Sequence, residues 1–159
     1  LKMIAHIRMA GLTRPAAPTA NRRRYPLSEP AACALNAQSY LDIQEDDYVV
    51  IYGSGYIGCI HAELARMAGA SKIIMVEIAE ERAKAAEKMI PGIYMVNPKE
   101  QDTVEEVKRI TRGRGANVVI TALSVPSCHT EAQQIALMTF PILIACHGIS
   151  SRSANAPSY

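Results

Sequence analysis

The sequence predicts an α/β fold, a doubly wound parallel sheet of about five strands with helices on both faces. Two patterns support this prediction. Short runs of consecutive apolar residues alternate with segments of helical periodicity between residues 48 and 146, as in strands that helices bury on both sides. A glycine-rich turn joins the first of these runs to the helical pattern that follows it. With 159 residues, the chain is long enough for one domain with a sizeable core.

The first helix is predicted to begin at Ser28, because serine caps helix N-termini and proline, here Pro30, is tolerated in the first turn. It should extend to about Leu41. The apolar run Tyr48–Tyr52 predicts a buried strand, and a helix of about 56–67 follows it. Residues at helical spacing predict the inward face of that helix, which comprises Ile57, Ile60, His61, Leu64 and Ala68.

The same alternation continues through the second half of the chain. Pro91-Gly92 ends one predicted helix and Gly113-Arg114-Gly115 precedes one predicted strand, since glycine and proline favour turns. Residues 150–159 are polar, so we expect the sixth strand of such a sheet to be missing. The other strands are expected at about 72–76, 93–96, 117–122 and 142–146, and the helices between them at about 79–89, 102–111 and 127–138.

The turn after the first strand has the spacing Gly-x-Gly-x-x-Gly, typical of dinucleotide-binding folds of the Rossmann type. Gly53 is expected to make the tight turn, Gly55 to let the backbone approach a pyrophosphate, and Gly58 to let the helix pack close to the strand. The N–H groups at the helix N-terminus would then hold the phosphates. The alternative is a glycine-rich turn without a ligand.

An acid stands where this fingerprint places the ribose contact. Glu77 lies nineteen residues after Gly58, at the end of the apolar run Ile73–Val76. Its carboxylate is expected to accept hydrogen bonds from both hydroxyls of the adenosine ribose, each worth about 1.5–3 kcal/mol. Because the same charge would repel a 2′-phosphate, Glu77 favours NAD over NADP.

Charge is unevenly distributed along the chain. Residues 1–28 hold six basic side chains and no acid, a composition compatible with mitochondrial targeting or, through Arg22-Arg23-Arg24, with nucleic-acid binding. We favour a remnant or linker, since the chain does not begin with Met and no aromatic residue interleaves the arginines. We therefore predict no nucleic-acid partner. The predicted organisation is a divergent segment 1–27, an NAD-binding domain 28–149 and a polar tail 150–159.

The cysteines indicate a reducing environment rather than a metal site. Cys33, Cys59, Cys128 and Cys146 are widely spaced and form no Cys-x-x-Cys pair, so neither a zinc ribbon nor a thioredoxin-type site is predicted. We expect reduced thiols and a cytoplasmic protein. No apolar stretch reaches the length of about 18 residues that a membrane span needs, and we predict no membrane partner.

With these residues in place, the chain resembles the coenzyme domain of the medium-chain, zinc-dependent alcohol dehydrogenases, in the branch of the polyol (sorbitol) and threonine dehydrogenases. The resemblance covers about Leu27 to Met138, roughly two thirds of the chain. Its most specific part is the Gly-Arg-Gly-Ala turn before the fourth strand. The motifs that carry it are Glu29–Ala34, Val49–Gly58, Met75–Glu77, Glu81-Arg82 and Gly113–Val119.

This resemblance implies NAD(P)-dependent oxidation of a secondary alcohol or polyol, in which a zinc ion in a separate catalytic domain polarises the alcohol oxygen. Glu29 would lie close to that zinc, and its alternative is an acid stabilised by the helix dipole. The residues implied to bind NAD are Gly53, Gly55, Tyr56, Ile57, Gly58, Glu77, Arg82, Ala122, Leu123 and Ser124.

The chain departs from the family at several positions. The cysteine ligand and the Gly-His-Glu motif of the zinc domain have no counterpart in this sequence, and we predict no catalytic residue. Tyr56 replaces a proline, and its ring would either stack on the cofactor or partly block the site. Cys146-His147 replace a glycine pair near the nicotinamide, and His61 is expected to be a packed, hydrogen-bonded histidine. The strand that pairs across the dimer in the family is the missing sixth strand.

The leading hypothesis is the NAD-binding domain of a zinc-dependent alcohol or polyol dehydrogenase, in a truncated or degenerate copy that would bind NAD weakly and would not turn over alone. One alternative is a non-catalytic NAD(H)-binding module or redox sensor that acts with a partner. Another is an S-adenosylmethionine methyltransferase, which the position of Gly58 disfavours.

Overall fold

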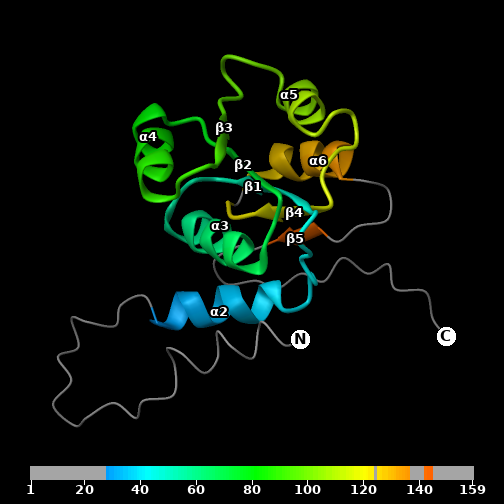
Figure 1. Ribbon diagram of the computed structural model, residues 1–159. Helices are drawn as coiled ribbons and strands as arrows, with labels where there is room; N and C mark the ends of the chain where they lie inside the picture. Colours follow the sequence, from blue (N-terminus) through cyan, green and yellow to red (C-terminus); the bar gives the residue numbers. More distant parts are fainter. Residues whose placement is uncertain (1–27, 124, 137–141, 145–159) are drawn as a thin grey trace, which may run out of the picture.

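The computed structural model describes residues 28–123, 125–136 and 142–144 and shows the predicted alternation of strands and helices (Figure 1). Four predictions concern residues outside these ranges. They are the segment 1–27, Ser124, the Cys146-His147 pair, and the polar tail 150–159, where the sixth strand is expected to be missing. The elements are α2 (Ser28–Gln38), β1 (Tyr48–Tyr52), α3 (Tyr56–Ala68), β2 (Lys72–Val76), α4 (Glu80–Met89), β3 (Tyr94–Val96), α5 (Thr103–Ile110), β4 (Val118–Thr121), α6 (Pro126–Ile135) and β5 (Ile142–Ile144).

The five strands form one parallel sheet in the order β3-β2-β1-β4-β5. The chain first builds outward from β1 through β2 to β3, and then crosses back to place β4 on the other side of β1. This reversal between β1 and β4 is the switch point at which doubly wound folds bind their ligands, beyond the carboxyl ends of the strands. The predicted fold class is confirmed.

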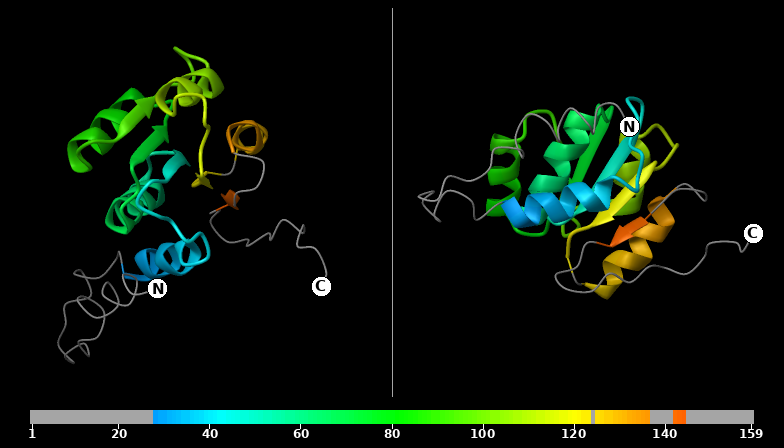
Figure 2. Two further views of the ribbon diagram at one scale, coloured as in Figure 1. Left: turned by 45° about the vertical axis from the view of Figure 1, so that its right-hand side comes forward. Right: turned by 90° about the horizontal axis from the view of Figure 1, so that it is seen from below.

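Helices cover both faces of the sheet (Figure 2), and two apolar cores lie between the helices and the sheet. One core joins alternate residues of β1, β2 and β4 to α3 and α4, with Val49, Ile51 and Met75 fully buried. The other joins the intervening strand residues to α5 and α6, through Val107 and Ala132 among others. The central strands β1, β2 and β4 are buried on both sides, so their apolar runs are continuous. The helix α2 packs against α3.

The inward face of α3 differs from the prediction. Gly58, Ala62 and Ala65 are buried, together with His61, whereas the larger predicted residues are only half-buried. Small side chains face the sheet because α3 approaches β1 very closely, which leaves no room there for isoleucine or leucine. The half-buried residues of the predicted face are Ile57, Ile60, Leu64 and Ala68. The inward face of α5 comprises the buried Val107 and Ile110, followed by the buried Thr111 directly after the helix, while Val104 is half-buried.

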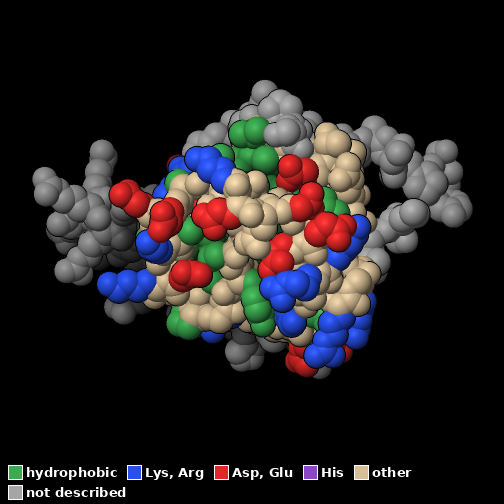
Figure 3. All heavy atoms as spheres, turned by 90° about the horizontal axis from the view of Figure 1, so that it is seen from above, with side chains coloured by type: hydrophobic (Ala, Val, Ile, Leu, Met, Phe, Trp, Pro, Cys, Tyr) green, Lys and Arg blue, Asp and Glu red, His purple; other side chains and the backbone are tan. Residues whose placement is uncertain are grey.

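The surface of the described residues mixes both signs of charge. On the face in Figure 3, acidic and basic side chains are interspersed. Several of these charges pair along helices, as Arg66 does with Glu63 and Lys84 does with Glu80. Within the described ranges, no helix combines the length and the apolar character that crossing a membrane requires.

The turn between β1 and α3 explains the close approach of this helix. Gly53 adopts a φ of 95°, a left-handed conformation that glycine reaches without strain. At Gly58, an added Cβ would lie 1.9 Å from the carbonyl oxygen of Gly53, a distance at which backbone atoms collide. The predicted structural roles of these two glycines are therefore confirmed.

We predict that Gly58→Ala destabilises the domain by about 3 kcal/mol or more, because the new methyl group can only fit if α3 moves away from β1. Gly55→Ala is the matched control. A Cβ at Gly55 would meet no heavy atom within 4 Å, and the residue has a φ of −69°, so its effect should stay below about 0.5 kcal/mol. Urea denaturation of both variants measures the difference, and equal stabilities would contradict the observed packing.

Candidate functional site

The carboxylate of Glu77, directly after β2, joins three segments at the carboxyl edge of the sheet. Its Oε2 accepts hydrogen bonds from the Ser54 backbone N–H and the Ser54 hydroxyl, both at 3.0 Å. Its Oε1 accepts from the Ala79 backbone N–H at 2.9 Å and from Nη2 of Arg82 at 2.8 Å. Glu77 therefore ties the glycine turn after β1 to the start of α4.

These contacts keep Glu77 ionised despite its burial. The residue is 5% exposed, and burial alone raises the pKa of a carboxyl group. The hydrogen bonds from Ala79, Ser54 and Arg82 outweigh that effect, so the pKa of Glu77 lies below its ordinary value. A negative charge is thus present at the position where the fingerprint predicts the ribose contact.

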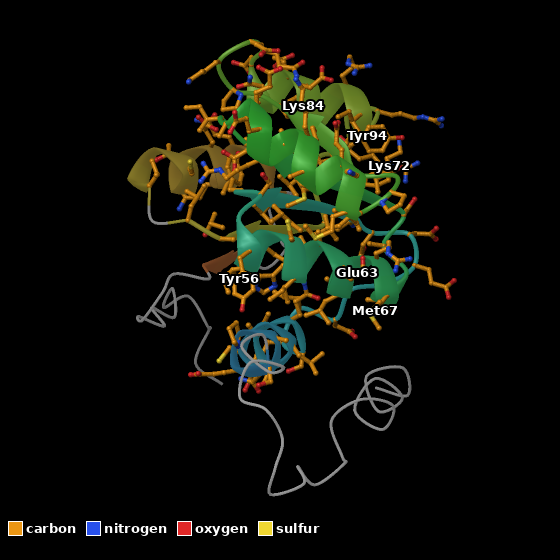
Figure 4. All side chains as sticks on the ribbon, turned by 90° about the vertical axis from the view of Figure 1, so that its left-hand side faces the viewer. Tyr56, Glu63, Met67, Lys72, Lys84 and Tyr94 are labelled. Atoms are coloured by element: carbon orange, nitrogen blue, oxygen red, sulfur yellow. The ribbon has the colours of Figure 1, made fainter. Side chains whose placement is uncertain are left out.

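The N-terminus of α3 faces open space. Gly55 forms the N-cap of this helix, without a side-chain cap, and is exposed. No heavy atom lies within 4 Å of a Cβ built there, so the space beside this helix N-terminus, where N–H groups can bind an anion, is open. Tyr56, the next residue, is 43% exposed at the start of α3 (Figure 4), and Ile57 is half-buried. The cofactor-binding role of these residues stays a prediction.

Residues after β4 border the same turn. The Ala122 N–H donates to the Tyr52 carbonyl, and a Cβ at Gly53 would lie 3.2 Å from Leu123 Cδ2 and 3.4 Å from the Ala122 carbonyl oxygen. Parallel pairing of β1 with β4 thus places Ala122 and Leu123 beside the glycines, as the switch-point geometry requires. Their contact with a cofactor stays a prediction.

Two contacts of Glu77 were not predicted from the sequence. The hydroxyl of Ser54 binds Glu77 across 23 positions of sequence, and Arg82, which the resemblance implied to bind NAD, forms an ion pair with Glu77. The signal for the serine was its place between the first two glycines of the fingerprint. The signal for the ion pair was the spacing of five residues between acid and arginine at the start of a helix.

The described residues do not fit a zinc site. Among them, no group of three or more His, Cys, Asp or Glu side chains is placed to hold a metal ion. Glu29 lies exposed in the first turn of α2, where an acid also interacts favourably with the helix dipole. Its zinc-linked role stays a prediction.

His61 has a structural partner. Gln38 Nε2 of α2 donates hydrogen bonds to His61 Nδ1 at 3.1 Å and to the His61 carbonyl oxygen at 2.7 Å. Burial lowers the pKa of the imidazole to about 4, so His61 is neutral at pH 7. The expectation of a packed, hydrogen-bonded histidine is confirmed, and its function is to fasten α2 to α3.

Comparison with known proteins identifies the family of this site. The profile of the family described as "Zinc-binding dehydrogenase" matches residues 57–137, about half of the chain. The chain belongs to this family. Sorbitol dehydrogenase from Bacillus subtilis (strain 168) is 34% identical to it over 106 residues, which is 67% of this chain and 30% of that protein. The predicted relationship to zinc-dependent alcohol and polyol dehydrogenases, which use NAD(P) and zinc, is confirmed.

Solved structures of the same family show the same fold. The 2R,3R-butanediol dehydrogenase from Bacillus subtilis aligns with a TM-score of 0.68 and 32% identity, over 74% of this chain and 33% of that one. A structure from Sinorhizobium meliloti 1021, described as a zinc-binding dehydrogenase bound to NADP, aligns with a TM-score of 0.69 and 26% identity, over 79% of this chain and 38% of that one. The aligned region thus spans well under half of the length of each relative.

We predict that His61 lowers the free energy of unfolding as the pH falls from 7.5 to 5.5. The folded pKa of about 4 lies below the unfolded value of about 6.5, so the unfolded chain binds the extra proton first. This contribution is fully present above pH 6.5 and is lost as the pH falls toward 4. The expected loss by pH 5.5 is about 1 kcal/mol.

His61→Leu should abolish this part of the pH dependence, while Gln38 keeps its hydrogen bond to the main-chain oxygen of residue 61. The difference between the two unfolding free energies, measured at both pH values, isolates His61 from the other histidines. Glu77 changes the unfolding free energy only at lower pH, because its pKa lies below the ordinary value. Parallel curves for wild type and variant would show that His61 is not buried as a neutral group.

Proposed function

We propose that this domain binds a nicotinamide dinucleotide and orients it for hydride exchange with a secondary alcohol or polyol, as the coenzyme domain of a zinc-dependent dehydrogenase. The observation that carries the proposal is the convergence of the open glycine turn and the ionised Glu77 at the switch point between β1 and β4. Membership of the zinc-binding dehydrogenase family supports this function over the methyltransferase alternative.

The chemistry that a bound nicotinamide ring would supply is the acceptance or return of a hydride. The residues of this chain would supply position. The N-terminus of α3, approached over Gly55, would hold the pyrophosphate. Glu77 and Arg82 would contact the adenosine ribose, while Ala122 and Leu123 would border the cleft toward the nicotinamide. Among the described residues, Glu29 is the one predicted to lie near the zinc ion, and no group of three or more potential ligands is found there.

The proposal includes the bounds of the domain and the cellular compartment that were predicted from the sequence. A dinucleotide-binding domain over residues 28–149 is supported by the sheet and its two cores, which lie within that range. A cytoplasmic setting is supported by the reduced thiols of Cys33 and Cys59. The proposed ligand is the dinucleotide, with no nucleic-acid or membrane partner.

We predict that Gly55→Ala weakens the binding of NAD and of NADP at least tenfold. A methyl group at this position contacts nothing in the protein but would occupy the space through which a pyrophosphate approaches the backbone. Isothermal titration calorimetry of the purified chain with each dinucleotide measures the effect, and the unfolding free energy of the variant verifies that its fold is unchanged.

Lys88→Ala, an exposed position of α4, serves as a control that should leave both affinities unchanged. This test is sharper than Glu77→Ala, because loss of the carboxylate also removes the partner of Ser54, Ala79 and Arg82. If a folded wild-type chain binds neither dinucleotide, or if Gly55→Ala binds both as tightly as the wild type, the proposed site is wrong.

A further inference from the structure

The ion pair between Glu77 and Arg82 changes the cofactor preference that the acid alone would give. A bare carboxylate after β2 would accept the two ribose hydroxyls and repel a 2′-phosphate. Here all four hydrogen bonds that a carboxylate readily accepts are already made inside the protein, two at each oxygen. A ribose hydroxyl can therefore bind Glu77 only by displacing one of these donors.

The four donors differ in how readily they can move. The backbone N–H groups of Ser54 and Ala79 are held by the glycine turn and by the start of α4. The Ser54 hydroxyl and the Arg82 guanidinium belong to side chains that can rotate. Ribose binding would thus exchange a side-chain donor for a sugar hydroxyl, and the guanidinium of Arg82 is the donor nearest to solvent.

The order of the two charges from the protein interior outward decides what an approaching ligand meets. The side chain of Glu77 is 3% exposed, whereas that of Arg82 is 58% exposed. Their contact is 2.8 Å long, so the buried negative charge is closely neutralised by the cation outside it. The guanidinium has five N–H donors, and a single one makes the contact with Glu77 recorded here.

We propose that Arg82 is the residue that determines cofactor specificity in this domain, and that it allows the site to accept a 2′-phosphorylated dinucleotide as well as NAD. This inference rests on the proposed dinucleotide function. A 2′-phosphate approaching the ribose end would meet the exposed guanidinium before the buried carboxylate, and arginine binds phosphate through paired N–H groups. With NAD, the guanidinium would move aside and Glu77 would accept the ribose hydroxyls.

The test compares the wild type, Arg82→Gln and Lys84→Gln by calorimetric titration with NAD and NADP. Lys84→Gln is the matched control, because it removes the same charge from the same helix at a residue that pairs with Glu80. The fragments 5′-AMP and 2′,5′-ADP, which lack the pyrophosphate link and the nicotinamide, report on the ribose end independently of the glycine turn.

For the wild type, we expect dissociation constants for NAD and NADP within about tenfold of each other, and tighter binding of 2′,5′-ADP than of 5′-AMP. Binding of NADP should weaken more steeply with added salt than binding of NAD, since it depends on one more charge contact. Arg82→Gln should weaken NADP and 2′,5′-ADP at least tenfold more than it weakens NAD, while Lys84→Gln should preserve the wild-type ratio.

Three results would overturn this assignment while leaving the proposed function intact. They are a wild type that binds NAD more than a hundredfold tighter than NADP, an Arg82→Gln variant that loses both cofactors equally, and a variant whose ratio is unchanged. A folded wild type that binds none of the four ligands would overturn both proposals together. Unfolding free energies of the two variants verify that neither substitution acts through the fold.

Discussion

The geometry of the whole site depends on one close contact, that between Gly58 of α3 and the carbonyl oxygen of Gly53 at the end of β1. Because this contact leaves no space for a side chain, α3 lies low against the sheet and covers it with Gly58, Ala62 and Ala65. The same contact brings the N-terminus of the helix to the carboxyl edge of β1. Local sterics at one residue thus determine both the packing of a core and the position of a helix N-terminus.

The buried charge of Glu77 holds the glycine turn in place at the edge of the sheet. The chain passes from β1 into α3 and from β2 into α4, and a single buried carboxylate holds both connections through backbone N–H groups. Its charge is tolerated in a largely buried position because four donors, one of them the cation of Arg82, compensate for the lost hydration. Glu77 therefore has a structural role as well as its proposed role in binding. Substitution of Glu77 disturbs both, whereas Gly55→Ala and Arg82→Gln are expected to affect binding without changing the fold.

The sequence was sufficient for the fold, its elements and the place of the glycines and Glu77 at the carboxyl edge of the sheet. Strands buried on both faces have continuous apolar runs, and the glycine spacing is distinctive. It was insufficient where the outcome depends on distances between segments. The inward face of α3 was misjudged since hydrophobicity ranks Ile60 and Leu64 above alanine, whereas the space beside β1 admits only small residues. The hydrogen bond from Ser54 to Glu77 and the ion pair with Arg82 need the folded turn to bring their atoms together. The local signals, a serine between two glycines and an arginine five positions after the acid, do not specify these contacts by themselves.

Gly55 and Gly58 of the same turn differ in the constraint that opposes their replacement. Gly58 faces a backbone oxygen within the domain, so any copy that folds must retain it whether or not it works. Gly55 faces empty space, and nothing in the folded protein alone opposes its replacement. Among descendants of this domain released from selection for cofactor binding, Gly55 would drift early and Gly58 would persist, so that the pair of positions records separately the history of the ligand and the history of the fold.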